Sequence, residues 1–410
     1  MTKHGWNDSL PANWRWVKAQ DCMDVRDGTH DSPKPVSEGI PLVTSKNLIG
    51  GFLDFSTCSF ISEEDHLSIS KRSKVDNGDI LYAMIGTIGN PVIVNKTREF
   101  SIKNVALFKC SNDCVFNKYI YHFLNSSLAE RQLKRKERGG TQKFISLGNL
   151  RELEIPLPPL EEQKRIASIL DKADAIRQKR EQAIKLADDF LRATFLEMFG
   201  DPVSNPKGWK VKPLKELSVK IASGSTPKGG SKVYVDKGIT FFRSQNVWKN
   251  DIRLDDVAYI DEKTHSSLKK SSLKNKDILM TKTGRFNTEN SSLGRAALFL
   301  GKDNSANVNG HVYLIRLKPG ILHEFIVYIL TSNEYREHIR EVCVGGIDKR
   351  QLNKEHIEDF PIICPPDDLQ MEFMRKLNSI QKIRSNSMTG LKEVIPLFNT
   401  LNQKAFSDGF

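Results

Sequence analysis

A long segment in the middle of the chain contains no Gly and no Pro, and it constrains the fold more than any other feature. The segment is Leu160–Phe199; Pro158 and Pro159 precede it and Gly200 follows it, so both of its boundaries carry helix start and stop signals. Its apolar residues recur at intervals of three and four, which predicts one helix about 55–60 Å long with an apolar stripe. The stripe comprises Ile166, Ile169, Leu170, Ala173, Ile176, Ala183, Ile184, Ala187, Phe190, Leu191 and Phe195. A helix of this length needs a partner along its stripe, and its central position predicts a spacer between two similar domains.

The second half of the chain repeats the order of features in the first half, with a period of about 200 residues. A second helical pattern, from Asp367 to about Phe406, ends the repeat, and Gly390 and Pro396 predict a kink or break in it. Two long helices with matching stripes are expected to pair antiparallel. The matching positions are Trp14 and Trp209, the segments that begin at Gly39 and Gly238, those that begin at Asn77 and Asn275, Gly86 and Gly284, Pro158-Pro159 and Pro365-Pro366, and Gln163 and Gln370.

Short β-rich runs separated by turn residues precede each helical pattern, which predicts mixed α/β (α+β) domains. The expected architecture is two globular domains separated by two long antiparallel, coiled-coil-like helices, with an approximate two-fold internal repeat. The expected segments are a first domain at 1–156, a central helix at 157–200, a second domain at 201–364 and a distal helix at 365–410.

The net charge of +12, with a pI near 9.2, favours a polyanionic partner, most often nucleic acid. No apolar run is long enough to span a membrane and the N-terminus is polar, so a cytoplasmic protein is expected. The six cysteines form no Cys-x-x-Cys pair, and we expect no metal site. The phosphate-binding, dinucleotide-binding, zinc-protease and serine-hydrolase motifs do not occur, so we do not expect an enzyme that acts alone.

Polar and basic residues gather in loops at equivalent places in the two halves. Hydroxyl groups, backbone amides and Lys suit phosphate oxygens, whereas Arg, Gln and Asn can pair with base edges. The candidates for DNA contact are Thr29, Lys34, Lys46, Asn47, Arg135 and Lys143 in the first half, and Ser225, Thr226, Lys228, Arg243, Gln245, Asn246, Lys282, Arg285, Asn287, Lys349 and Arg350 in the second half.

Several motifs together resemble those of a known family over nearly the whole chain. The most specific is Ile155-Pro-Leu-Pro-Pro-Leu-Glu-Glu-Gln163 at the entry to the central helix, with Met198-Phe-Gly-Asp-Pro202 at its end. Asp27-Gly-Thr-His30, Ser223-Gly-Ser-Thr-Pro227 and a Gly-Gly-x-x-Lys motif near the end of each domain accompany it. The sequence thus resembles the specificity subunit of type I restriction-modification systems. The second copy of the helix entry, Ile363-Cys-Pro-Pro-Asp-Asp-Leu-Gln370, departs from the usual form.

The resemblance implies two target recognition domains that each read one half of a split site in double-stranded DNA, while the helices set the distance between the halves. It also implies methyltransferase subunits, two of them expected, that dock on the helices and bring S-adenosylmethionine, and a motor-nuclease subunit that uses ATP and Mg²⁺; this subunit would hold no cofactor and catalyse nothing. The partner-binding candidates are Gln163, Arg177, Arg180 and Phe199. Two alternatives remain open: a DNA enzyme with an unrecognised metal site, and a coiled-coil scaffold whose domains bind protein or a small ligand.

Overall fold

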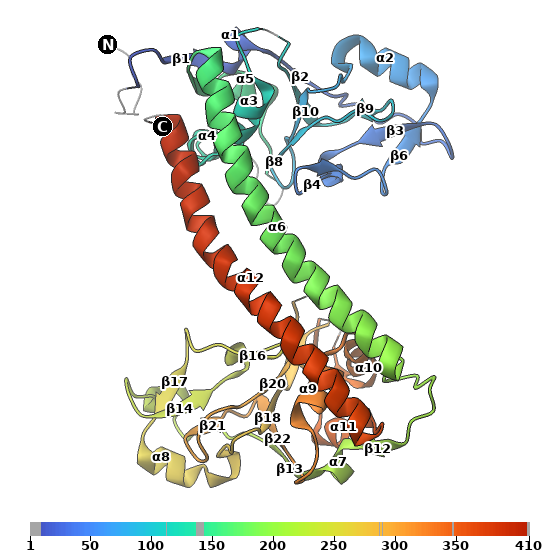
Figure 1. Ribbon diagram of the computed structural model, residues 1–410, viewed down its shortest axis with the longest axis vertical. Helices are drawn as coiled ribbons and strands as arrows, with labels where there is room; N and C mark the ends of the chain where they lie inside the picture. The colour runs from blue at the N-terminus through green and yellow to red at the C-terminus, as the bar shows by residue number, and fades with distance from the viewer. Residues whose placement is uncertain are drawn as a thin grey trace. The chain divides into compact units, whose positions relative to one another are not determined.

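The chain forms two compact units. The computed structural model describes residues 10–111, 113–136, 143–286, 288, 290–346 and 348–407. Unit 1 contains residues 1–183 and 387–410, and unit 2 contains residues 184–386. The two long helices, α6 (Leu160–Phe199) and α12 (Asp367–Ser407), each contribute one part to both units (Figure 1).

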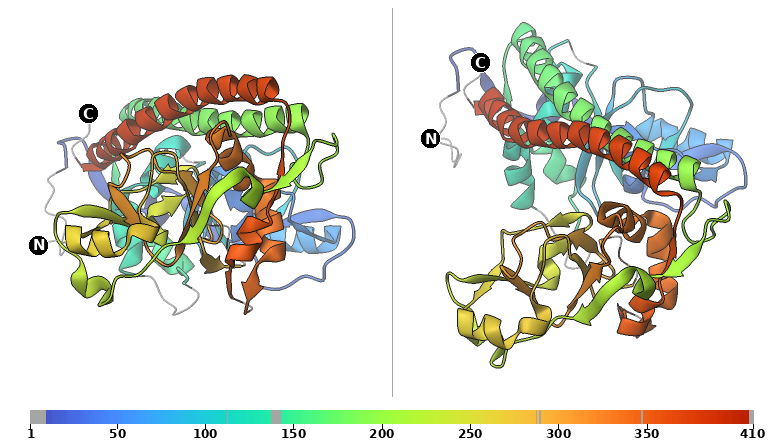
Figure 2. Two further views of the ribbon diagram at one scale, coloured as in Figure 1. Left: turned by 90° about the horizontal axis from the view of Figure 1, so that it is seen from below. Right: turned by 60° about the horizontal axis from the view of Figure 1, so that its bottom comes forward.

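The long helices pack together in an antiparallel manner, as the sequence predicts. In unit 1, Leu170 near the start of α6 belongs to the same core cluster as Phe406 near the end of α12. In unit 2, Phe195 near the end of α6 contacts Phe373 near the start of α12, with ring centroids 5.3 Å apart. The views in Figures 1 and 2 agree, with α6 (green) beside α12 (red). The predicted bounds of the central helix, Leu160 and Phe199, are those of α6.

The sequence predicts a kink or a break in the distal helix, and the break is wrong, because α12 continues through both Gly390 and Pro396. Gly390 has a packing role: a Cβ atom at this position would collide with the guanidinium of Arg180 on α6. The missing side chain therefore lets Arg180 approach the backbone of α12. Packing between the helices stabilises α12 more than these two residues weaken it.

The predicted apolar stripe of α6 is only partly buried. Ile166, Leu170 and Phe195 are in the core, but Ile176 is 50% exposed and Phe190 is 61% exposed. Intervals of three and four residues fit more than one face of a helix as long as α6, so the spacing alone could not separate the buried positions from the exposed ones.

The elements of unit 1 outside the long helices form a four-stranded sheet in the order β2-β10-β7-β8, a three-stranded sheet in the order β6-β3-β9, and the pairs β1-β11 and β4-β5. Their bounds are β1 Arg15–Lys18, α1 Ala19–Cys22, β2 Asp24–Asp27, β3 Ile40–Val43, η1 Ser45–Asn47, β4 Leu48–Ile49, β5 Phe52–Leu53, β6 Ser59–Ile61, α2 Glu63–Ser73, β7 Ile80–Ala83, β8 Gly89–Ile93, β9 Ser101–Ile102, β10 Val105–Lys109, α3 Asn117–Leu124, α4 Ser127–Lys134, α5 Leu147–Arg151 and β11 Glu154–Leu157.

Unit 2 repeats this topology with the sheets β13-β22-β18-β20 and β17-β14-β21 and the pairs β12-β25 and β15-β16, and it adds the ribbon β19-β24-β23. The bounds are β12 Val211–Pro213, α7 Leu214–Leu217, β13 Ser218–Ser223, η2 Gly230–Val233, β14 Ile239–Phe242, η3 Ser244–Asn246, β15 Val247–Trp248, β16 Asp251–Ile252, β17 Ala258–Ile260, α8 Glu262–Ser267, η4 Lys269–Ser271, β18 Ile278–Thr281, β19 Thr283–Arg285, β20 Ala296–Leu298, β21 Ala306–Val308, β22 Val312–Leu317, α9 His323–Thr331, α10 Asn333–Val342, β23 Val344–Gly345, β24 Lys349–Gln351, α11 Lys354–Glu358 and β25 Pro361–Ile363.

Each four-stranded sheet is buried on both faces. In β18, Met280 packs toward the cluster that contains Phe195 and Phe199 of α6, whereas the adjacent Leu279 packs toward the cluster that contains Phe242 of β14. This alternation follows from the period of two in a strand. The sheet is therefore fixed between the helices on one face and the three-stranded sheet on the other, and the loops at its edge extend from a rigid base.

Candidate nucleic-acid interface

Three loops of unit 2 meet at one edge of the four-stranded sheet. The antiparallel registers Ser223↔Tyr313 and Thr281↔Val312 bring the ends of β13 and β18 next to the start of β22. Hydrogen bonds join the loops that follow: Gly224 N donates to Val312 O over 2.8 Å, and Lys282 N donates to His311 O over 2.9 Å. We call this edge, with the segments 224–228, 243–246, 282–286, 309–311 and 349–351, the loop edge of unit 2.

The other two segments join the same edge through strand pairing. Strand β14 runs parallel to β21 with Phe242 opposite Val308, and Asn309 N donates to Phe242 O over 2.9 Å. Strand β24 pairs with β19 with Arg350 opposite Gly284. The loop edge thus brings together most of the second-half candidates, namely Ser225, Thr226, Lys228, Arg243, Gln245, Lys282, Arg285, Lys349 and Arg350.

Unit 1 has an equivalent loop edge. Thr29, directly after the Gly28 that follows β2, forms a bridge with Lys103, and Lys103 N donates to Val43 O at the end of β3 over 2.9 Å. Gly86 N, after β7, donates to Lys143 O over 3.0 Å. The candidates Lys34 and Lys46 are exposed in the loops after β2 and β3, and Arg135 is exposed at the C-terminal cap of α4. Asn287 lies outside the described residues, as do Gly139 and Gly140.

Four cations at the loop edge of unit 2, namely Lys282, Arg285, Lys349 and Arg350, lack carboxylate partners among the described residues. Arg285 and Lys349 lie directly opposite each other in the β19–β24 pair, an arrangement of like charges that destabilises a sheet. In the described part of the chain, no carboxylate oxygen lies within 4.0 Å of the charged nitrogens of Lys282, Arg285, Lys349 or Arg350. The edge therefore suits a polyanion, which would offset this repulsion.

The opposite edge of the same sheet differs. There, Lys276 pairs with Glu324 over 2.9 Å, and Arg316 pairs with the buried Asp277 over 2.7 Å. Unit 1 also has a paired cation at its opposite edge, because Lys109 contacts Asp79 over 2.8 Å. These cations at the opposite edges are thus paired, unlike Lys282, Arg285, Lys349 and Arg350 at the loop edge of unit 2.

Aromatic rings orient two of the basic side chains at the loop edge. The guanidinium carbon of Arg350 lies 3.9 Å from the ring centroid of Phe286, and the Nζ of Lys282 lies 5.8 Å from that of Tyr313. The Nε of Arg350 is buried and has no hydrogen-bond partner among the described residues. A cationic side chain that is already held against a ring loses less conformational entropy when it binds an anion.

Arg243 and Gln245 already share a carboxylate. Arg243 Nη2 donates to Asp256 Oδ1 over 2.9 Å, and Gln245 Nε2 donates to Asp256 Oδ2 over 2.7 Å. The hydrogen bonds from Gln245 and then Arg243 lower the pKa of Asp256 below its usual value. A base edge or phosphate would have to replace this exposed carboxylate.

Two of the predicted base contacts, Asn47 and Asn246, are buried, with 2% and 1% of their surfaces exposed. Asn246 Oδ1 accepts from Arg243 N over 2.9 Å, and its Nδ2 donates to the carbonyls of Arg253 and Asp256. Asn47 makes the same type of contacts in unit 1, with Thr44 N and Asp54 O. Because each amide is fully used inside the protein, we reassign both residues to holding the loop in shape.

The structure also revises the predicted partner-binding residues. Gln163 and Phe199 are fully buried; Gln163 accepts from Phe116 N and donates to Cys114 O and Pro158 O, so it anchors α6 to its own unit. Arg177 pairs with Asp174 and Glu181 on the same helix, and Arg180 packs on Gly390. The burial of Gln163 and Phe199 assigns these two residues to packing within their own units. Arg177 and Arg180 are partly exposed, and their contact with a partner stays a prediction.

Sequence reasoning missed Trp248, Arg253 and Arg295, which extend the loop edge of unit 2. Arg295 directly precedes β20, and its carbonyl accepts from Thr281 N over 2.9 Å. Trp248 lies in the β15–β16 hairpin, whose turn at Lys249-Asn250 was the available signal in the sequence. Trp248 and Arg253 belong to one hairpin but Arg295 comes from a separate segment, so only the fold shows that the three residues meet.

Among the described residues, no group of three or more His, Cys, Asp or Glu side chains could hold a metal ion. Burial raises the pKa values of the Cys22 and Cys110 thiols to about 12, which disfavours the thiolate. No helix in the described ranges has the length and apolar content to cross a bilayer.

The repeated units, the paired long helices and the basic loop edges define a class of two-domain nucleic-acid-binding proteins. The model of the type I restriction modification DNA specificity domain matches residues 13–186 and 206–397. The chain belongs to this family: it is a specificity subunit of a type I restriction-modification system, and it recognises a DNA target sequence without catalytic activity of its own. It acts with modification and restriction subunits, and these other subunits bind the cofactors.

Relatives match most of the chain. The StySPI specificity subunit of Salmonella potsdam is 21% identical over 90% of this chain and 81% of its own length. The MjaIX specificity subunit of Methanocaldococcus jannaschii is 24% identical over 89% of this chain and 86% of its own. The crystal structure of the S subunit from M. genitalium covers 100% of this chain and 98% of its own, with a TM-score of 0.58 and 16% identity, and thus has the same fold.

Proposed function

We propose that each unit reads one half of a bipartite, asymmetric DNA site through its loop edge. The observation that carries this proposal is the repeat of the loop edge: the same strand ends, in the same order, present different polar side chains in the two units. For example, Thr44 and Lys46 after β3 correspond to Arg243 and Gln245 after β14. Two domains that share a backbone fold but present different side chains are suited to the recognition of two different base sequences. The recognition domains would comprise 1–156 and 201–364, with 157–200 and 365–410 as the helices.

The loop edge of unit 2 offers both kinds of contact that a sequence-reading protein needs. Thr226 and Lys228 are exposed next to backbone amides and suit phosphate oxygens, which fix the position of the duplex. Arg285 is exposed on a strand, and its planar fork can pair with the O6 and N7 atoms of guanine. We therefore propose that Arg285, together with the adjacent Lys349 and Arg350, enters a groove of the DNA.

The long helices would set the distance between the half-sites and dock the methyltransferase subunits. Large apolar side chains are exposed at equivalent positions of the two helices: Ile176 of α6 matches Ile383 of α12, at 50% and 58% exposed, and Phe190 matches Leu397, at 61% and 63%. Unit 1 thus carries Ile176 and Leu397, and unit 2 carries Ile383 and Phe190. Exposed apolar residues repeated in this way suit a protein partner. The repetition supports two methyltransferase subunits, one for each unit.

The remaining assignments follow from this role. A restriction motor-nuclease subunit would join the same complex, and S-adenosylmethionine, ATP and Mg²⁺ would bind in the partner subunits. Because the substrate is cellular DNA, we infer that the protein works in the cytoplasm.

Replacement of Arg285 and Lys349 by Ala should reduce the sequence specificity at one half-site and leave the specificity at the other half-site unchanged. Loss of a bidentate contact to a base costs about 1–3 kcal/mol, so discrimination at the affected position should fall by roughly 10- to 100-fold. The full chain would be expressed with its methyltransferase subunit, and the methylated adenines would be mapped across a genome.

The control is Lys276→Ala, which removes a cation that pairs with Glu324 at the opposite edge of the sheet. It should leave the methylated sequence unchanged. Equal loss of specificity at both half-sites in the double variant would refute the assignment of one half-site to unit 2.

A further inference from the structure

Two arginines enclose a tryptophan where the loop edge of unit 2 reaches the β15–β16 hairpin. The guanidinium carbons of Arg253 and Arg295 lie 3.5 Å and 3.8 Å from the ring centroid of Trp248. At such distances each guanidinium must lie directly over the ring, so the two occupy opposite faces of the indole. We call this arrangement the arginine–tryptophan stack.

Backbone carbonyls fix the inner part of the stack. Trp248 Nε1 donates to Gln245 O over 2.9 Å, which orients the indole. Arg295 Nε donates to Ser291 O over 3.0 Å, and a second nitrogen donates to Asn290 O. Burial, followed by the charges of Arg253 and Arg336, lowers the pKa of Arg295 below its usual value. The inner arginine is thus held in an environment that already has excess positive charge.

The outer arginine is presented to solvent. The Arg253 side chain is 48% exposed, and its nearest carboxylate contact is from Nε to Asp251 Oδ2 at 3.7 Å, longer than a hydrogen bond. The guanidinium therefore lies flat on the indole while its N–H donors remain available. The cation–π contact with Trp248 fixes the plane of the Arg253 guanidinium before any ligand binds.

Whereas Asp251 lies beside Arg253 itself, two further carboxylates near this hairpin are already paired with other arginines. Glu334 accepts from Arg192 over 2.8 Å, and Asp188 accepts from Arg384 over 2.8 Å. Lys249, in the turn of the same hairpin, adds a further positive charge, and burial lowers its pKa. The stack therefore lies in a region whose positive charge these acidic groups do not offset.

The fold does not require the stack, because the equivalent hairpin of unit 1 lacks it. The same backbone hydrogen bond identifies the equivalent residues: Asp54 N donates to Asn47 O, and Arg253 N donates to Asn246 O. Asp54 in unit 1 thus has the charge opposite to that of Arg253. One residue after each Asn-Leu or Asn-Val pair, unit 1 has the exposed Ile49 where unit 2 has Trp248.

We propose that the arginine–tryptophan stack is a binding site for a phosphate of the DNA backbone, with Arg253 as the residue that contacts it. The site rests on the proposed function and adds to it a contact that holds the duplex without reading bases. Two N–H groups of a preorganised guanidinium can bind two phosphate oxygens at once. Because unit 1 has an aspartate at this position, the contact would hold the DNA on the side of unit 2 alone.

The test is DNA binding by the full chain in complex with its methyltransferase subunit, measured against salt concentration on a target duplex and on an unrelated duplex. Arg253→Gln should weaken binding several-fold to both duplexes and should reduce the slope of log K against log salt by about 0.9, the value for one phosphate contact. The methylated sequence should not change. Arg253→Lys should keep the slope, because it keeps the charge.

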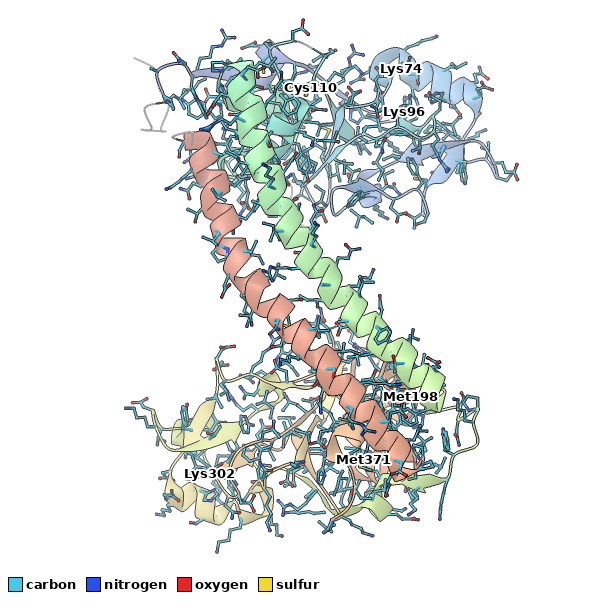
Figure 3. The ribbon with its side chains drawn as sticks, viewed as in Figure 1. Lys74, Lys96, Cys110, Met198, Lys302 and Met371 are labelled. Carbon is cyan, nitrogen blue, oxygen red and sulfur yellow. The ribbon has the colours of Figure 1, made fainter. Side chains whose placement is uncertain are left out.

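Lys302→Gln is the matched control, because it removes one charge beyond the other end of β20 (Figure 3) and should leave the slope as it is. An unchanged slope in Arg253→Gln would overturn the phosphate site, and so would a relaxed half-site sequence, which would make Arg253 a base-reading residue. If the unsubstituted complex bound DNA without any dependence on salt, the proposed function itself would fail.

Discussion

Insertion of seven residues into each long helix should lengthen the gap between the two half-sites by about three base pairs. One heptad of helix adds ~10.5 Å, and one base pair of B-DNA rises ~3.4 Å. The insertions belong after Ala183 in α6 and after Asn386 in α12, where the chain passes from one unit to the other. Seven residues preserve the faces of both helices, so the packing within each unit should remain. Mapping of methylated adenines would give the gap directly.

Two comparisons make the insertion experiment decisive. The same seven residues added after the C-terminal residue should leave the gap unchanged. The half-site sequences of the insertion variant should also be unchanged, because neither loop edge is altered. A variant that methylates DNA with the original gap would refute the role of the helices as the spacer.

Charged substitutions at the exposed apolar residues of the helices should remove the methyltransferase subunits. A buried apolar side chain contributes about 1.5–3 kcal/mol, so loss of two in one unit should weaken one docking site by roughly 150- to 20,000-fold. We expect Ile176→Asp with Leu397→Asp to leave a complex with one methyltransferase subunit, and substitution of all four residues to leave none. Light scattering of the purified assemblies gives the stoichiometry.

The control for docking is Lys302→Asp, which changes an exposed residue outside the long helices and should leave assembly intact. Thermal unfolding would show that the helix variants still fold, because the four side chains are already exposed. Full assembly in the variant with four substitutions would mean that the subunits dock on another surface.

The bounds of α6 could be predicted because Pro and Gly mark both of its ends. The burial of its residues could not, because Ile176 and Phe190 keep helical spacing with the buried positions although they face outward. Pro396 misled the prediction for α12 for a related reason. The helix propensity of single residues contributes less to the stability of a long helix than its packing on a partner helix does.

The loops of the candidate interface could be located from the sequence, because polar segments that follow apolar strands repeat in both halves; their contact with DNA stays a prediction. The roles of individual residues were harder to predict. Asn47 and Asn246 are of a type that can read adenine, but the same amide can also close a tight loop, and the sequence does not show which of these it does. The arginine–tryptophan stack required the fold, since Trp248, Arg253 and Arg295 meet only when β20 lies beside the hairpin.

We propose that two similar units read two separate parts of one DNA site. The most direct measurement is a map of the adenines methylated in a genome by the chain together with its methyltransferase subunit. The expected result is one asymmetric sequence with two specific parts and a gap of fixed length in which any base is accepted. A single continuous sequence, or methylation without sequence preference, would contradict it.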